Sequence, residues 1–185
     1  MISTGEIKRG VTIEMDGNLY QIVDFQHIKM GRGSAQVRMK LRNVRKGDLI
    51  ERTVQAGERF QRARLDHRNV QYLYNDGELW HFMDQQTYDQ FALGRDILGD
   101  AVDYLTDGAT AILSEYEGEP ISVELPASVV LTVTRVEPGV KGDTATGANK
   151  PATVETGLKV LVPLFVNQGD RIKVDTRSGE YLERA

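Results

Sequence analysis

The sequence predicts an all-β protein, and three observations support this fold class. Short runs of alternating apolar and polar residues recur along the whole chain, bounded by Gly, Asn, Asp or Pro. Glycine makes up 18 of the 185 residues, as expected for a chain with many tight turns. A single stretch has the composition of helix. Such short, evenly spaced strands favour small barrels over one large sandwich.

The expected elements begin with a hairpin whose strands cover 18–30 and 34–44, joined by Gly31-Arg32-Gly33. In a later segment, Asn75-Asp76-Gly77 lies between aromatic residues and is a strong hairpin-turn signal. Residues 84–105 contain good helix formers, so we expect one or two short helices there, with Asp84 as a candidate N-cap. The further strand-turn-strand segments are expected at 46–60, 71–84, 111–125, 128–138, 157–166 and 170–185.

Charge is distributed unevenly and predicts three domains. The net charge is −4, but residues 1–64 carry 13 Lys and Arg against 7 Asp and Glu. Residues 65–127 carry 2 against 13, and residues 128–185 carry 8 against 7. These shifts, with Pro126 near the second, place domain boundaries after residues 64 and 127. A polyanion is therefore expected to contact the first domain, whereas the acidic run is typical of a solvated surface.

Several function classes find no support in the residues. The chain has no cysteine, so disulfides and thiol chemistry are excluded. It shows no long apolar run and no apolar signal-peptide core, so a cytoplasmic protein without a membrane segment is expected. His27, His67 and His81 lack metal-ligand spacing, and neither a phosphate-binding loop nor a nucleophile-turn motif is present. We expect no metal, no cofactor and no catalytic residue.

The first hairpin has the composition of an RNA-contacting element. Strands of about eight residues would carry its turn roughly 25 Å from the base. No acid occurs between Asp24 and Asp48, so the cations of this stretch are expected to be available to phosphates. Arginine at the tip offers a planar fork of donors and a stacking face. The expected RNA-binding residues are Lys29, Arg38, Lys40 and Arg42, with Arg32 at the tip.

A plainer interpretation stays open at this point, because Gly-x-Gly turns are common and a basic strand face is often only solvated. Small β-barrels do bind polynucleotides in a sequence-tolerant way. On the residues alone, the prediction is a modular all-β protein associated with RNA.

The stretch KPATVETGLKVLVPLFVNQG (150–169) resembles the signature of the bacterial elongation factor P family. Similar family segments follow the same order in YLYNDGELWHFMD (72–84), GDTATG (142–147) and IKVDTRSGEY (172–181). The resemblance covers essentially the whole chain. It implies an SH3-like (KOW-like) N-terminal barrel followed by two OB folds, arranged in an elongated L shape.

The resemblance also implies a function. Elongation factor P is not an enzyme; it binds the ribosome, both rRNA and ribosomal proteins, beside the P-site peptidyl-tRNA. There it promotes peptide-bond formation at consecutive prolines and relieves stalling. A monomer is expected. The alternative from a different class is a general OB-fold RNA-binding or RNA-chaperone protein.

Two groups of residues acquire roles through this resemblance. The tip, Arg32 with Met30, Gly31, Gly33 and Ser34, would reach towards the acceptor end of the peptidyl-tRNA. The loop with Gly142, Asp143 and Thr144 would contact the tRNA elbow and recognise prolyl-tRNA. Many family members carry a modified lysine at the tip, whereas another branch carries a rhamnosylated arginine. Members of that branch commonly have proline before the glycine, at the position where this chain has Met30. Arg32 is therefore rhamnosylated, otherwise modified or bare, and an arginine-modifying enzyme is an open partner.

Overall fold

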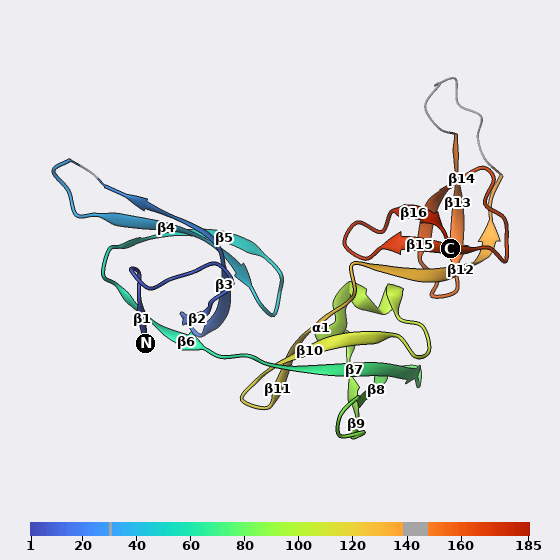
Figure 1. Ribbon diagram of the computed structural model, residues 1–185, viewed down its shortest axis with the longest axis horizontal. Coiled ribbons are helices and arrows are strands. Elements are labelled where there is room, and N and C mark those ends of the chain that lie inside the picture. Colours follow the sequence, from blue (N-terminus) through green and yellow to red (C-terminus); the bar gives the residue numbers. More distant parts are fainter. Residues whose placement is uncertain (30, 139–147) are drawn as a thin grey trace. The chain divides into compact units, whose positions relative to one another are not determined.

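The structure, a computed structural model, describes residues 1–29, 31–138 and 148–185 (Figure 1). Met30 and the loop residues Gly142, Asp143 and Thr144 lie outside the described residues. The chain is all-β, as predicted, with two short helical segments in the part described. No helix within that part is long and apolar enough to cross a membrane.

The described elements follow one another along the chain as β1 (Ile2–Ser3), β2 (Thr12–Met15), β3 (Asn18–Ile28), β4 (Gln36–Asn43), β5 (Leu49–Gln55), β6 (Arg59–Ala63), β7 (Asp66–Asn75), β8 (Trp80–Asp84), β9 (Gln90–Leu93), α1 (Arg95–Leu98), the 3-10 helix η1 (Gly99–Tyr104), β10 (Thr110–Tyr116), β11 (Glu119–Glu124), β12 (Ser128–Val136), β13 (Asn149–Val154), β14 (Lys159–Pro163), β15 (Arg171–Asp175) and β16 (Tyr181–Arg184). They pack into two compact units, residues 1–67 with 114–122 and residues 68–113 with 123–185, called unit 1 and unit 2 below.

Unit 1 is built on a six-stranded sheet in the order β1-β6-β2-β3-β4-β5. Alternation along β4 buries Val37, Met39 and Leu41 completely, because side chains two apart on a strand share a face. A second, smaller cluster in the same unit joins Leu19 and Ala63 to Ile121 from β11. Residues 114–122 thus share apolar packing with the N-terminal strands.

Unit 2 contains most of a sheet in the order β11-β10-β7-β8-β9, called the central sheet below, and all of a sheet in the order β14-β13-β12-β15-β16, called the last sheet. The first sheet packs around Val70, Phe82 and Leu113, each with no exposed surface. The core of the second sheet includes Tyr104, which is 7% exposed and comes from η1, far earlier in the chain. The hydroxyl of Thr156 adds a hydrogen bond of 2.5 Å to the carbonyl of Asp103 in η1.

Residues 84–105 confirm the helix prediction only in part, since the helices are limited to α1 and η1. Asp84 is not a helix N-cap. It ends β8, and its carboxylate accepts hydrogen bonds from the amides of Gln86 and Thr87, at 2.7 and 3.1 Å. This closed turn leads into β9, which pairs with β8. The sequence interpretation also missed β13, whose Pro151 lies where the pairing with β12 ends.

Candidate nucleic-acid interface

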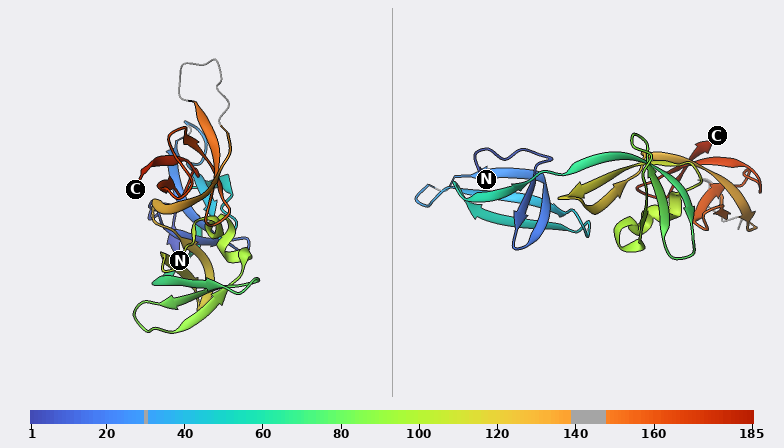
Figure 2. Two further views of the ribbon diagram at one scale, coloured as in Figure 1. Left: turned by 90° about the vertical axis from the view of Figure 1, so that its right-hand side faces the viewer. Right: turned by 90° about the horizontal axis from the view of Figure 1, so that it is seen from below.

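The predicted hairpin is confirmed as β3 and β4, but it is not a free two-stranded ribbon. β3 pairs with β4 as far as Ile28 opposite Gln36. β5 pairs with the other edge of β4 over the same length, as far as Gln36 opposite Gln55. Lys29 and residues 31–35 therefore extend from the end of three paired strands (Figures 1 and 2). Because β4 is paired on both edges, we expect the β3–β4 hairpin to bend less than an isolated two-stranded hairpin would.

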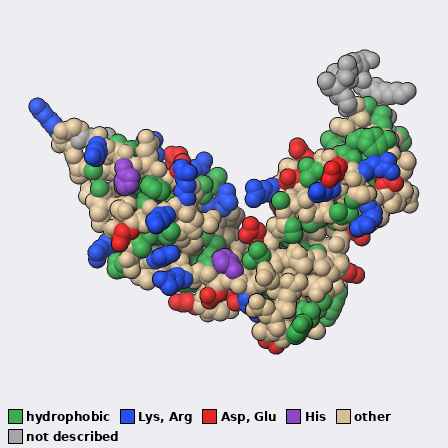
Figure 3. Space-filling view, in the orientation of Figure 1, with side chains coloured by type: hydrophobic (Ala, Val, Ile, Leu, Met, Phe, Trp, Pro, Cys, Tyr) green, Lys and Arg blue, Asp and Glu red, His purple; other side chains and the backbone are tan. Residues whose placement is uncertain are grey.

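One face of this sheet carries the predicted row of cations. Arg38, Lys40 and Arg42 are exposed and alternate with the buried residues of β4. Within the residues described, none of these three side chains makes a hydrogen bond or ion pair. Figure 3 shows basic side chains spread over unit 1, one of them standing off the end of the hairpin. We call Arg38, Lys40 and Arg42 the basic face.

The basic face is not free of acids, although no acid occurs between Asp24 and Asp48 in the sequence. Lys40 lies between Asp24 on β3 and Glu51 on β5, because the register of both neighbours places a carboxylate beside it. Arg38 has the uncharged neighbours Gln26 and Thr53. Acids distant in sequence thus reach this face through strand pairing, a feature that a search along one strand does not detect.

Asp24 is itself paired, and its partner adds a cation that the sequence analysis did not single out. Arg9 donates to Asp24 Oδ1 from Nε at 3.0 Å and from Nη2 at 2.8 Å. The amide of Phe25 donates to the same oxygen at 3.0 Å. The Arg9 hydrogen bonds, followed by that amide, hold the pKa of Asp24 below its usual value. Asp24 therefore remains charged near neutral pH, with Arg9 balancing its charge.

The tip loop leaves Arg32 exposed, together with Gly31, Gly33 and Ser34. Lys29 is exposed as well and follows the last residue of β3. No described atom lies within 4 Å of the Cβ position of Gly31, so the missing side chain leaves the loop open to an approaching surface. The backbone of Gly31 does not use the left-handed region, so this turn position does not require glycine for its φ angle.

The acids of the central sheet are partly engaged in the fold. Asp84, 3% exposed, also accepts a hydrogen bond from Nη1 of Arg68 at 3.0 Å. Asp76 accepts from the amides of Glu78 and Leu79, and its other oxygen lies 2.7 Å from Nε2 of His81. The bond to His81 is the main cause that holds the pKa of Asp76 far below its usual value. No group of three or more acids and histidines in the described residues is arranged to hold a metal ion.

Comparison with known proteins gives three family matches in consecutive segments. The Elongation factor P (EF-P) KOW-like domain matches residues 3–60, and the Elongation factor P (EF-P) OB domain matches residues 65–123. The family described as Elongation factor P, C-terminal, matches residues 129–184. These descriptions confirm the predicted all-β fold class, with a KOW-like domain at residues 3–60 followed by an OB domain at residues 65–123.

Full-length relatives agree with these matches. The chain is 52% identical to Elongation factor P of Thermoanaerobacter sp. (strain X514) over 184 residues, and 52% identical to that of Moorella thermoacetica over 185 residues, covering 100% of each protein. Among solved structures, Eukaryotic translation initiation factor 5A from Methanococcus jannaschii has the same fold, with a TM-score of 0.52 at 23% identity. That match covers 66% of this chain and 92% of the other.

Proposed function

The chain belongs to the elongation factor P family of translation elongation factors, and from this premise we propose that it binds the ribosome beside the P-site peptidyl-tRNA and promotes peptide-bond formation between consecutive prolines. The observation that carries the proposal is the pairing of β3, β4 and β5 in unit 1, which combines an exposed basic face with an exposed arginine in the loop after β3. The protein would act as a cytoplasmic monomer with three domains, 1–64, 65–127 and 128–185.

In this proposal the basic face contacts the phosphates of rRNA or tRNA and fixes the register of the sheet on the RNA. Arg32 then reaches the acceptor end of the peptidyl-tRNA. Proline is a poor reactant because its ring restricts the backbone. A side chain that holds the tRNA end in a productive position lowers the entropic part of the barrier, so no proton-transfer residue is required.

Discrimination among tRNAs is proposed for Gly142, Asp143 and Thr144, which would contact the tRNA elbow and favour prolyl-tRNA. Asp143→Ala should weaken that preference more than overall binding. Reaction rates with matched prolyl- and phenylalanyl-tRNA substrates test this, and an equal loss for both would contradict it.

The state of Arg32 is a separate part of the proposal. A bare guanidinium offers five N–H donors in a rigid fork, whereas a rhamnosylated or otherwise modified side chain adds hydroxyl groups. Intact-mass measurement of the protein from its native host, with fragmentation, decides between these forms and shows whether an arginine-modifying enzyme acts on the chain.

A reconstituted translation system tests the central claim. The protein should speed synthesis through three consecutive prolines and leave messages with isolated prolines nearly unchanged. Arg32→Ala should abolish most of the acceleration, while affinity for the ribosome stays within about threefold, because several cations share the binding. Arg59→Ala, another exposed arginine of unit 1, is the matched control and should keep full activity.

The alternative function, a general OB-fold RNA-binding or RNA-chaperone protein, makes the opposite prediction. Such a protein would bind unrelated RNAs with similar affinity and would leave stalling at consecutive prolines unchanged. Equal loss of ribosome affinity and acceleration in Arg32→Ala would also contradict the separation of binding and positioning proposed above.

A further inference from the structure

Arg9 enters unit 1 on a tight turn that is fixed to β3. The amide of Val11 donates to the carbonyl of Lys8 at 3.3 Å, and Gly10 between them has φ +88°. A positive φ at the third position of such a turn favours glycine. The amide of Gly10 donates to the carbonyl of Ile22 at 2.8 Å, and the amide of Ile22 donates to the carbonyl of Val11 at 2.9 Å. The turn therefore holds the backbone of Arg9 at a set place beside β3.

Strand register places the guanidinium of Arg9 on the same side of the sheet as the basic face. Asp24, which accepts both hydrogen bonds from Arg9, lies opposite Lys40 in the pairing of β3 with β4. Residues opposite each other in antiparallel strands share a face of the sheet. The three cations of the basic face stand against two neighbouring acids, Asp24 and Glu51, so their net charge is +1. Arg9 raises this net charge to +2.

The hydrogen bonds to Asp24 use one edge of the guanidinium and leave another edge available. Nε and Nη2 of Arg9 both donate to Oδ1 of Asp24, at 3.0 and 2.8 Å. The N–H groups of Nη1 and the second N–H of Nη2 make no hydrogen bond within the described residues, and the side chain is 73% exposed. The Nη1–Nη2 edge is a fork that can donate two parallel hydrogen bonds to a phosphate. Asp24 thus holds Arg9 from the side while this fork stays accessible.

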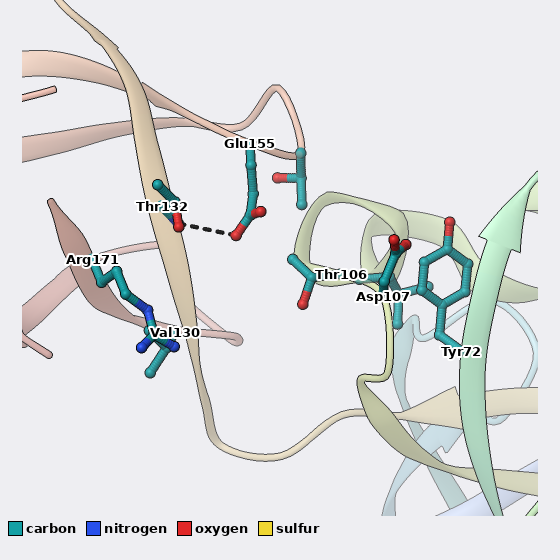
Figure 4. Close-up of a pocket in the computed structure, with 9 residues that line it drawn as sticks. Tyr72, Thr106, Asp107, Val130, Thr132, Glu155 and Arg171 are labelled. Carbon is teal, nitrogen blue, oxygen red and sulfur yellow. Dashed lines mark hydrogen bonds between the residues drawn. The ribbon is translucent and has the colours of Figure 1, made fainter. Parts of the chain in front are cut away.

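Two other exposed arginines lack this combination. Arg52 on β5 is also paired with an aspartate, Asp16, but it lies opposite the buried Met39 and so belongs to the other face of the sheet. Arg171 lines a polar groove of about 420 Å³ in unit 2 (Figure 4). The guanidinium of Arg171 makes no ion pair in the part of the chain that the structure describes. These two arginines therefore serve as matched comparisons for Arg9.

We propose that Arg9 binds a backbone phosphate of RNA through its Nη1–Nη2 edge, with Asp24 as the residue that positions it. An exposed ion pair contributes little to stability, so folding alone gives a weak reason for the two hydrogen bonds. A guanidinium already held on one edge loses less conformational freedom on binding than a free one does. The inference rests on the RNA contact proposed for the basic face and adds a fourth cation to it.

The first test measures affinity for ribosomes with peptidyl-tRNA in the P site over a range of salt concentrations. Arg9→Gln should weaken binding about fivefold and make the slope of log affinity against log salt shallower by about one, as for one lost phosphate contact. Arg9→Lys should keep the slope and weaken binding about threefold, because an ammonium group keeps the charge but lacks the fork. The controls Arg52→Gln and Arg171→Gln remove the same charge and should keep the original slope.

A second test asks whether Asp24 positions Arg9 or only repels phosphate. Asp24→Asn removes an acid from this face, and repulsion alone would strengthen binding by the same factor whether or not Arg9 is present. Positioning makes the effects of the two residues depend on each other. Asp24→Asn should therefore weaken binding about twofold in the original protein and strengthen it in the Arg9→Gln variant.

Four results would overturn the inference. An unchanged salt slope in Arg9→Gln would exclude a phosphate contact at Arg9. An equal change of slope in Arg52→Gln or Arg171→Gln would show a diffuse effect of net charge. Equal affinities of Arg9→Lys and the original protein would exclude the fork. Equal effects of Asp24→Asn in the two backgrounds would exclude positioning.

Failure of the proposed function gives a different result. If glutamine at all three positions of the basic face left the salt slope unchanged, the proposed RNA contact of that face would be wrong, and this inference with it. If that triple variant made the slope shallower and Arg9→Gln did not, only the inference about Arg9 would be wrong.

Discussion

Arg32 and Tyr104 are both long side chains in short connecting segments, and their surroundings are opposite. Arg32 is exposed in the loop after β3 and makes no contact in the described residues that holds it in place. Tyr104 ends η1 and is 7% exposed within the core of the last sheet. The first arrangement leaves a side chain available to a partner, and the second joins two sheets of unit 2. Function and stability should therefore respond separately to changes at these residues.

The largest loss of stability is expected for Tyr104→Ala. Removing a buried aromatic side chain costs about 3–5 kcal/mol, and here it opens a cavity where η1 meets the core of the last sheet. Urea unfolding measures the loss. Tyr104→Phe is the control and should lose less than about 1 kcal/mol, because no described residue bonds the hydroxyl. If Tyr104→Ala lost less than about 1 kcal/mol of unfolding free energy, Tyr104 would not have the stabilising role that distinguishes it from Arg32.

A smaller loss is expected for Gly179→Ala, which tests the same contact from the other side. Gly179 has φ +75°, and a Cβ built there would lie 3.1 Å from the hydroxyl of Tyr104. Gly57 in unit 1 has φ +89° and open space around its Cβ position. Both alanine variants should lose about 1–2 kcal/mol from backbone strain, and Gly179→Ala should lose more. Equal urea midpoints would show that Tyr104 moves aside without cost.

The carboxylate of Asp84 should make stability depend on acid pH. The amides of Gln86 and Thr87, followed by Arg68, lower its pKa in the folded state. Below about pH 4 the unfolded chain takes up this proton first, so the contribution is complete above that pH and is lost as the pH falls towards the folded value. The urea midpoint measured from pH 6 to 2.5 should fall less steeply in Asp84→Asn. Parallel curves would exclude Asp84 as a source of the dependence.

The smallest effect on stability is expected on the basic face. Replacing Arg38, Lys40 and Arg42 by glutamine should lower the free energy of unfolding by less than about 0.5 kcal/mol per site. These side chains are exposed and make no hydrogen bond in the described part of the chain. Binding to RNA should change in a different way. The slope of log affinity against log salt should become shallower by about two to three, one step for each lost phosphate contact.

A matched triple variant separates the change in salt slope from a change in net charge. It replaces three exposed cations of the last sheet by glutamine: Arg135, Lys159 and Arg177. That variant should keep the original salt slope in ribosome binding. If both triple variants had the same slope of log affinity against log salt, the proposal that the basic face contacts RNA would be contradicted.

Features that depend on local sequence were predictable. The period of two along β4 identified the cation row, and the glycines located the turn with Arg32, because strand alternation and turn chemistry act within a few residues. Asp84 shows the limit of this logic. An aspartate that binds two following amides begins a helix or closes a turn equally well. The pairing of β9 with β8 decides the outcome, and it depends on more distant residues.

Features that depend on strand register were not predictable. Glu51 lies beside Lys40, 11 residues earlier, through the pairing of β4 with β5. Arg9 reaches Asp24 from a segment outside the strands, 15 residues earlier in the chain. The place of Tyr104 in the core of the last sheet is more remote still, since most of that core follows it by 27 or more residues. Roles that came from family resemblance for Met30, Gly142, Asp143 and Thr144 stay predictions, because these residues lie outside the described part.

The packing of Ile121 with Leu19 and Ala63 has a consequence for recombination. A fragment that ends at residue 64 would leave Leu19 and Ala63 without their apolar cover and would be prone to aggregation. A chimera that exchanges the N-terminal segment with that of another organism should carry residues 114–122 with it. The residues that form unit 1 are therefore encoded in two separate parts of the gene, although they fold as one compact unit.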